Sequence, residues 1–257
     1  MTLPFGLESS RLVKLIRLLA LLAVGYVQVR WQWERLDAQE REQAVQHWAR
    51  RALRVFGVDL EVQGPLSSLG PVLMVSNHLS WLDILVYLGL GPVRFVSKSE
   101  VAAWPLVGRY AQACRTLFIE RRSRRDVSRM VSLLAQSLAG GDVVMIFPEG
   151  TTSLGDAVLP FHANLLQAAL QSGAPVQALA LSYRLKATQS LTTTPCFVGD
   201  QTLVASIWAI LGLGPTVAQI SCAPQVAPES LGRERRALAH ALHDEVARLH
   251  SALINRA

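Results

Sequence analysis

The feature that most constrains the fold is a change of pattern after Gly57, where short apolar runs begin to alternate with longer amphipathic segments. Such alternation is typical of an α/β layer fold with a central, mostly parallel sheet flanked by helices. The expected helices are Trp81–Leu88, Asp126–Ala139, His162–Gln171 and Arg233–Ile254. The expected strands are Val58–Val62, Leu73–Val75, Val93–Val96, Leu117–Ile119, Val143–Phe147, Val176–Leu181 and Val217–Ser221.

Two helical segments precede this alternation, so we divide the chain into an N-terminal membrane-associated helical segment, residues 1–56, and an α/β domain, residues 57–257. The second segment, near Asp37–Phe56, carries acidic residues early and basic residues late, an order that suits the helix dipole. The two segments are expected to form a hairpin that faces a bilayer. For the second helix alone, an ordinary solvated face is the alternative.

The first segment has the composition of an interfacial anchor. Its apolar run, residues 18–29, contains 12 residues, fewer than the roughly 20 that a spanning helix needs. Basic residues precede the run and tryptophans follow it, a pattern that favours a monotopic helix in the membrane interface. A soluble core helix and a true span are the alternatives. The flanking residues are Arg11, Lys14, Arg17, Trp31 and Trp33.

Composition agrees with a protein of the membrane surface. The 257 residues include 25 basic and 19 acidic ones, and the formal net charge of +6 favours anionic surfaces such as lipid headgroups. No zinc-finger spacing or RNA-recognition motif is present, so no nucleic-acid partner is expected. The three cysteines are odd in number and far apart, which indicates reduced thiols and a cytosolic location of the active domain. Nothing in the sequence specifies an oligomeric state.

His78 and Asp83 are the residues with the clearest chemistry. Five positions correspond to about 140° of a continuous helix, so His78 is expected in a turn, with Asp83 reaching back from the first turn of the following helix. An imidazole oriented by a carboxylate can remove a proton from an attacking hydroxyl. No Gly-x-Ser-x-Gly elbow is present, which favours a substrate hydroxyl and direct transfer without a covalent intermediate. The alternative is a polar turn followed by a helix-start carboxylate.

Three polar residues follow apolar runs that are expected to be strands: His78, Arg121 and Glu149. In open α/β sheets, ligands bind outside the carboxyl ends of the strands. The three side chains are therefore expected at one edge of the sheet. Histidines at 240, 243 and 250 share a C-terminal helical segment, but without nearby carboxylate or cysteine ligands they are expected to form a polar face, and no metal is expected.

Four short blocks in one order resemble the glycerolipid acyltransferase family of the lysophosphatidic acid acyltransferase type. The blocks are Asn77–Asp83, Phe118–Arg121, Phe147–Gly150 and, in part, Pro175–Val176. The resemblance implies acyl transfer from acyl-CoA or acyl carrier protein to the free hydroxyl of a lyso-lipid. It implies that His78 is the general base, that Asp83 orients it, and that no cofactor is needed beyond the thioester co-substrate.

The resemblance also implies a set of substrate-binding residues, which are Lys98, Arg121, Glu149, Gly150, Thr151 and Thr152. Glu149 is expected to orient the acceptor hydroxyls or to pair with Arg121, and Gly150 to allow a positive φ angle or close backbone approach. The family often has arginine at the position of Thr152 and a second proline at that of Ala178. A threonine cannot replace a bidentate phosphate contact from arginine.

Lysophosphatidic acid is the leading acceptor, in phospholipid biosynthesis at the cytoplasmic face of a membrane. Because Thr152 and Ser153 also resemble members that act on other lipids, lyso-ornithine lipid or another lysophospholipid is the alternative. Two alternatives belong to other classes: a membrane-binding scaffold without turnover, and a lipid hydrolase in which water replaces the acceptor alcohol.

Overall fold

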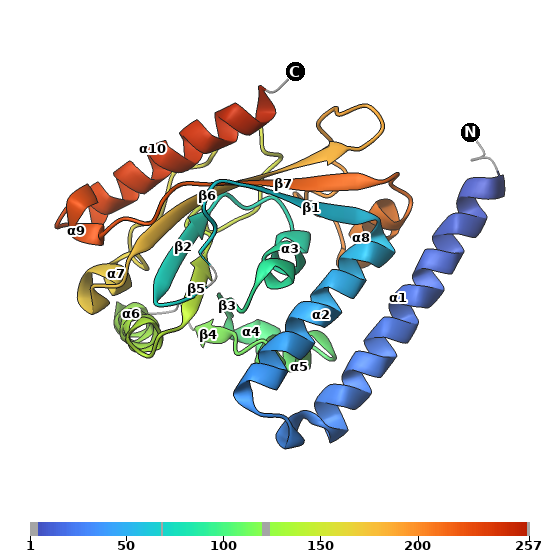
Figure 1. The fold of residues 1–257 in the computed structure, drawn as a ribbon, viewed down its shortest axis with the longest axis horizontal. Helices are drawn as coiled ribbons and strands as arrows, with labels where there is room; N and C mark the ends of the chain where they lie inside the picture. The colour runs from blue at the N-terminus through green and yellow to red at the C-terminus, as the bar shows by residue number, and fades with distance from the viewer. Residues whose placement is uncertain (1–4, 68, 120–123, 256–257) are drawn as a thin grey trace.

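The computed structural model describes residues 5–67, 69–119 and 124–255, and within them all seven expected strands are present (Figure 1). They form one sheet of order β1-β7-β6-β2-β5-β3-β4, in which only β6 and β7 are antiparallel neighbours. The predicted α/β class is confirmed. The strands are β1 (Val58–Gln63), β2 (Val72–Ser76), β3 (Arg94–Lys98), β4 (Leu117–Ile119), β5 (Val143–Ile146), β6 (Val176–Leu185) and β7 (Thr216–Cys222).

The observed helices agree with the predicted ones less closely than the strands do. Those predicted near positions 37, 81, 126 and 233 are present, whereas the one predicted over 162–171 begins only at Gln167, after turns at 163–166. Four short helices were not predicted. The helices are α1 (Phe5–Trp31), α2 (Ala38–Phe56), α3 (Leu82–Leu90), α4 (Ser99–Ala102), α5 (Val107–Ala113), α6 (Arg124–Ala139), α7 (Gln167–Ser172), α8 (Leu203–Leu211), α9 (Pro228–Leu231) and α10 (Arg235–Ile254), with the 3-10 turn η1 (Trp33–Arg35).

The central strands are buried on both faces, as expected for a parallel sheet covered by helices. Successive side chains of β2 point to opposite sides: Val72 and Met74 pack with α2, α3 and α8, whereas Leu73 and Val75 pack with α6, α7 and α10. The helices thus form a layer on each face. This arrangement leaves the carboxyl ends of β2, β3 and β5 at one edge of the sheet.

The predicted N-terminal hairpin is present: α1 and α2 lie side by side on the outside of the domain (Figure 1). Asp37 and Glu40 form a capping box at the start of α2, and Gly57 ends that helix in the left-handed conformation, with φ 79°. Trp48 of α2 stacks on Tyr110 of α5, with ring centroids 4.9 Å apart. The stacking of Trp48 on Tyr110 holds the hairpin against the α/β domain.

The estimate that the N-terminal apolar run is too short to span a membrane is wrong. Helix α1 has 27 residues, about 40 Å at 1.5 Å per residue. Its segment Arg11–Trp31 is, among the described residues, the one helix long and apolar enough to cross a membrane by length and composition. The apolar run 18–29 is only part of this helix, which also includes Arg11, Lys14 and Arg17.

The basic residues of α1 do not all face outward. Lys14 Nζ donates to the carbonyl of Leu213 at 3.2 Å, and the guanidinium of Arg11 lies 5.7 Å from the centre of the Trp208 ring. Burial lowers the pKa of Lys14, and the nearby Arg11 lowers it further. Two of the four basic residues of α1 therefore tie this helix to α8 and the turn after it.

Asp142 joins the start of β5 to three other segments. Its carboxylate accepts hydrogen bonds from Arg94 Nη1 at 2.5 Å and Ser137 Oγ at 2.7 Å, and it pairs with Arg115 Nη2 at 3.0 Å. Burial alone would raise the pKa of Asp142, but the hydrogen bonds from Ser137 and Arg94 outweigh it, so the pKa is lowered. The ionised carboxylate is thus the stabilised form in the folded protein.

We expect Asp142→Asn to lower the free energy of unfolding by about 1–2 kcal/mol at neutral pH, since two charge-assisted bonds weaken. A carboxyl whose pKa is lowered by folding stabilises the folded protein at pH values above its pKa in the unfolded chain, about 3.9. That stabilisation is lost as pH falls through the pKa of the carboxyl in the folded protein. The difference in the free energy of unfolding between Asp142→Asn and wild type should therefore be constant near neutral pH and fall toward zero below about pH 4. Urea unfolding of Asp142→Asn and of the exposed control Asp244→Asn measures it, and equal midpoints for both at pH 7 would contradict the assignment.

Candidate active site

The loop that carries the candidate base joins β2 to α3 and is fixed at its start by Asn77. This buried side chain donates from Nδ2 to Leu181 O at 3.0 Å and accepts from Leu181 N at 2.8 Å. Both bonds reach the backbone of β6, the neighbouring strand. The position of His78 is therefore set by the sheet itself rather than by a mobile surface loop.

His78 and Asp83 meet as their spacing predicted. His78 Nδ1 lies 2.8 Å from Asp83 Oδ2, and Asp83 sits in the first turn of α3. The same oxygen accepts the backbone N–H groups of Leu79 at 2.7 Å and Ser80 at 2.9 Å. The Asp83 side chain is fully buried, whereas that of His78 is 18% exposed. With Nδ1 bonded to the carboxylate, Nε2 is the ring nitrogen left for a substrate hydroxyl.

Aromatic packing fixes the plane of the imidazole. The His78 ring stacks on Phe147, the residue after β5, with centroids 3.9 Å apart and planes 7° apart. Phe95 of β3 and Tyr87 of α3 surround the other parts of the Phe147 ring, at centroid distances of 6.0 and 6.1 Å. The base is thus held on one side by a carboxylate and on its face by an aromatic cluster.

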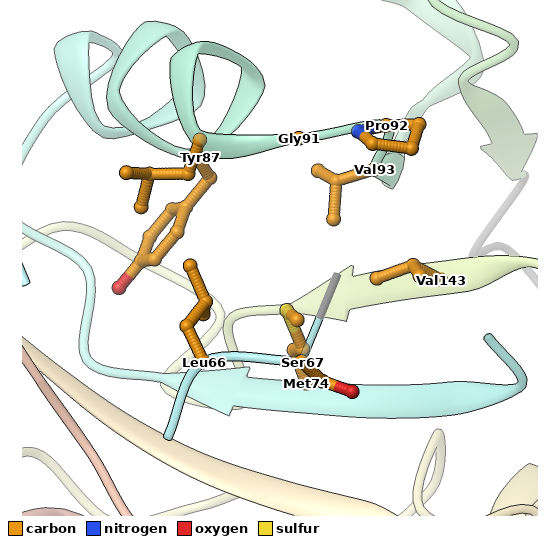
Figure 2. A pocket seen from close by; sticks show the side chains of 9 residues that line it. Leu66, Ser67, Met74, Tyr87, Gly91, Pro92, Val93 and Val143 are labelled. Atoms are coloured by element: carbon orange, nitrogen blue, oxygen red, sulfur yellow. The ribbon is translucent and has the colours of Figure 1, made fainter. Parts of the chain in front are cut away.

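A small pocket lies beside Tyr87, one member of this cluster. Figure 2 shows it between the end of α3 and the strands, lined by Tyr87, Met74, Val93 and Val143 among others. Its volume is ≈ 10 Å³, about that of one water molecule. The pocket as it stands is too small for an acyl chain.

Tyr183 of β6 is a contact of the site that the sequence argument missed. Its hydroxyl donates to Asp83 Oδ1 at 2.7 Å, the carboxylate oxygen that faces away from His78. Burial raises the pKa of Tyr183 well above its usual value, and the charge of Asp83 raises it further, so the phenol stays a donor. The sequence signal for this contact is a tyrosine within an otherwise mostly aliphatic strand.

We expect Tyr183→Phe to lower kcat about tenfold with little change in KM. Losing one hydrogen bond to a charged group costs about 1.5–3 kcal/mol, of which part is recovered by the other donors to Asp83. The matched control is Tyr87→Phe, another fully buried tyrosine, whose hydroxyl bonds Ser76 Oγ at 2.6 Å instead. Steady-state kinetics on Tyr183→Phe and Tyr87→Phe tests this prediction. If both variants lose the same factor in kcat, Tyr183 acts only by stabilising the fold.

Glu149 braces the catalytic loop. Its Oε1 accepts the backbone N–H of His78 at 2.8 Å and its Oε2 accepts that of Leu159 at 3.1 Å. Burial raises its pKa, although the two backbone N–H bonds oppose the shift. The side chain is 4% exposed, so both oxygens serve backbone amides in this structure. A substrate contact of Glu149 stays a prediction, and its pairing with Arg121 falls outside the described residues.

The remaining predicted residues lie along the same edge. Gly150 has a φ of 70°, which confirms the expected left-handed backbone, and a Cβ there would meet His162 Cδ2 at 3.0 Å. Thr151 is exposed, and Lys98 is exposed at the end of β3. The hydroxyl of Thr152 donates to the carbonyl of Phe197. Contacts of Lys98, Thr151 and Thr152 with a headgroup stay predictions.

Cys196 is the thiol nearest to the dyad, and its environment argues against a nucleophile. Its Sγ lies 3.5 Å from Leu154 O, and burial, together with the charge of Asp83, raises its pKa to about 12. A thiol in this state is not a thiolate at neutral pH. Within the described residues, no group of three metal-ligating side chains comes together.

A histidine hydrogen-bonded to a fully buried carboxylate thus lies at the carboxyl edge of the α/β sheet. The family model described as acyltransferase matches residues 58–182. The chain is also 36% identical over 206 residues to the lyso-ornithine lipid O-acyltransferase of Pseudomonas aeruginosa, covering 78% of each protein. The chain therefore belongs to the acyltransferase family and is an acyltransferase enzyme.

Two further similarities agree. The 1-acyl-sn-glycerol-3-phosphate acyltransferase of Neisseria meningitidis is 36% identical over 176 residues, which is 68% of each chain. The crystal structure of the 1-acyl-sn-glycerophosphate acyltransferase of Thermotoga maritima superposes with a TM-score of 0.68, covering 96% of this chain and 99% of that one. At 20% identity, the latter supports the fold alone.

Proposed function

We propose that the enzyme transfers an acyl group from acyl-CoA or acyl carrier protein to the free hydroxyl of a lyso-lipid, with lysophosphatidic acid as the leading acceptor. The observation that carries the proposal is the 2.8 Å bond between His78 Nδ1 and Asp83 Oδ2, with the other ring nitrogen left for a hydroxyl. Membership of the acyltransferase family supports it.

In the proposed reaction, His78 Nε2 takes the proton of the acceptor hydroxyl as its oxygen attacks the thioester carbonyl. The carbon–sulfur bond then breaks, and the imidazolium returns the proton to the leaving thiolate. Asp83 stabilises the imidazolium and keeps Nδ1 protonated throughout. Tyr183 and the amides of Leu79 and Ser80 in turn orient Asp83. Because a thioester is already activated, these steps call for no metal or prosthetic group.

We further propose that α1 anchors the enzyme at the cytoplasmic face of a membrane without crossing it. The outward face of α1 is apolar along most of its length, with Leu12 52%, Ile16 65% and Val24 57% exposed. Trp31, beneath the guanidinium of Arg30, marks one end, and aromatic and basic side chains of this kind favour the interface. Since the opposite face packs on the α/β domain, lying in the interface leaves those contacts intact.

A specific observation favours lyso-ornithine lipid as a second candidate acceptor. Position 152 carries a threonine whose hydroxyl bonds the Phe197 carbonyl, so it supplies no cation for a phosphomonoester. A relative that covers 78% of this chain is named for lyso-ornithine lipid. The chemistry at His78 is the same for both acceptors.

The acceptor panel tests this choice. We expect kcat/KM for lysophosphatidic acid to exceed that for lyso-ornithine lipid when both are offered with one long-chain acyl-CoA, because Lys98 and Arg121 supply positive charge for a phosphate. A ratio that favours lyso-ornithine lipid would replace the leading acceptor with the second candidate. Lysophosphatidylethanolamine serves as an acceptor control that has a phosphodiester but no phosphomonoester.

A further inference from the structure

Helix α8 exposes an apolar face that the core does not explain. Its nine residues carry no charge, and Val204 and Trp208, four positions apart on one side, are 77% and 41% exposed. On the opposite side Ser206 and Ile210 are fully buried. Single exposed hydrophobic residues are ordinary on protein surfaces, whereas a continuous apolar patch marks a contact. The neighbourhood of α8 shows that this face is part of such a patch.

Helix α1 is a neighbour of α8 and also exposes apolar side chains. The guanidinium of Arg11 lies 5.7 Å from the Trp208 ring, and Lys14 Nζ bonds Leu213 O, just beyond the end of α8. The first half of α1 therefore lies beside α8. We call the two together the α1–α8 surface, which consists of Leu12, Ile16, Leu19, Val24, Val204 and Trp208.

The charged residues of α1 between Arg11 and Val29 are all positive, and residues 203–211 of α8 carry no charge. Of these basic residues Arg17 is exposed, whereas Arg11 and Lys14 contact α8 and the turn after it. An anionic lipid surface offers an apolar interior beside negative headgroups, which suits exposed apolar side chains next to a cation. Tryptophan side chains are enriched at the interface between the headgroups and the apolar interior of a bilayer. The chemistry of the surface therefore fits an anionic bilayer.

Helix α8 is also tied to the catalytic loop. Trp81 Nε1, three residues after His78, donates to Ser206 Oγ at 3.0 Å on the buried side of α8. Phe197 donates its backbone N–H to Leu79 O at 2.8 Å, and its carbonyl accepts a hydrogen bond from Thr152. The segment that leads to α8 therefore also contacts the catalytic loop. A membrane contact through α8 would hold the dyad close to the bilayer surface.

We propose that α8 is a second membrane-contact element, in which Val204 and Trp208 insert beside α1 into an anionic bilayer and present the catalytic loop to lipid acceptors within it. This rests on the proposed action on lyso-lipids. Helix α1 supplies most of the anchoring area, and α8 sets the orientation of the α/β domain on the surface. Residues 203–211 therefore contribute to membrane affinity although they lie far from the N-terminus in sequence.

The test uses the full chain and vesicles of phosphatidylcholine with phosphatidylglycerol. We expect Val204→Glu to weaken vesicle binding about tenfold, since a buried apolar contact is replaced by a charge that anionic lipids repel. A glutamate in the first turn of α8 suits the helix dipole, so the helix is preserved. The matched control is Leu133→Glu on α6, 39% exposed and outside the α1–α8 surface, which should bind as wild type does.

Two readouts separate the outcomes. The kcat/KM of Val204→Glu for a short-chain soluble acceptor should equal that of wild type, and its kcat/KM for a vesicle-embedded acceptor should fall about tenfold with binding. If Val204→Glu loses activity on the soluble acceptor, Val204→Ser replaces it, with an expected loss in binding of about threefold. If Val204→Glu binds vesicles as tightly as Leu133→Glu does, the proposal is wrong.

Ile16→Glu on α1 distinguishes this proposal from the α1 anchor. If Ile16→Glu weakens vesicle binding and Val204→Glu does not, α8 has no membrane role while the anchor stands. If neither variant weakens binding, both the α8 proposal and the anchor are wrong. Activity of both variants on the soluble acceptor reports separately on the acyltransferase reaction, which does not depend on either result.

Discussion

His78→Ala should lower kcat about 10²–10⁴-fold, the contribution typical of a positioned general base. The imidazole is held by Asp83 and by stacking on Phe147, and in the proposed reaction it receives the hydroxyl proton. KM should change little, because a general base is expected to contribute mainly to the transition state. Single-turnover acylation measures the chemical step directly.

The control for this result is His240→Ala, an exposed histidine of α10 outside the site. It should retain wild-type kcat, and both variants should keep the thermal midpoint within a few degrees. If His78→Ala retains more than about a tenth of wild-type turnover in the chemistry-limited regime, the assignment of the base is wrong.

Asp83→Asn should lower kcat about 10²–10³-fold. A neutral amide cannot stabilise the imidazolium, and it favours the tautomer with the proton on the wrong ring nitrogen. Its NH2 group would also face donors, since Asp83 accepts from the amides of Leu79 and Ser80 and from the Tyr183 hydroxyl. Because the Asp83 side chain is fully buried, this mismatch cannot be relieved by water.

The split between kcat and KM separates a catalytic from a merely structural effect of Asp83→Asn. Because the carboxylate acts on the imidazolium formed in the transition state, kcat of the folded variant should fall while its KM changes little. A smaller yield of folded enzyme that keeps the wild-type kcat would mean that Asp83 only supports the loop. Asp244→Asn, which removes an exposed carboxylate, should keep the wild-type kcat.

The sequence was most informative where local pattern and tertiary structure agree. All seven strands follow from apolar runs bounded by turns, and the His78–Asp83 contact follows from helix geometry, because Asp83 lies in the turn immediately after the loop. The bonds of Glu149 and Tyr183 could not be predicted in this way. Their partners are backbone amides and a carboxylate far away in the sequence, and strand order decides which of them meet.

Two helical features were misjudged for different physical reasons. The segment that forms α8 is apolar at nearly every position, so it shows no period that would distinguish a helix from a strand. The length of α1 was underestimated because basic residues were taken as its boundary. Lys14 and Arg11 are accommodated inside the helix by contacts with Leu213 and Trp208, which no local pattern reveals.

The most direct test of the account is the fate of a radiolabelled acyl group. Purified enzyme is incubated with labelled acyl-CoA and lysophosphatidic acid in vesicles, and the products are separated by thin-layer chromatography. The account predicts labelled diacyl lipid from the wild type, formed in equal amount to the free thiol released, and almost none from His78→Ala. Labelled free fatty acid as the main product would indicate hydrolysis, and the absence of any product across the whole acceptor panel would indicate a membrane-binding scaffold; either result would contradict direct acyl transfer by the His78–Asp83 pair.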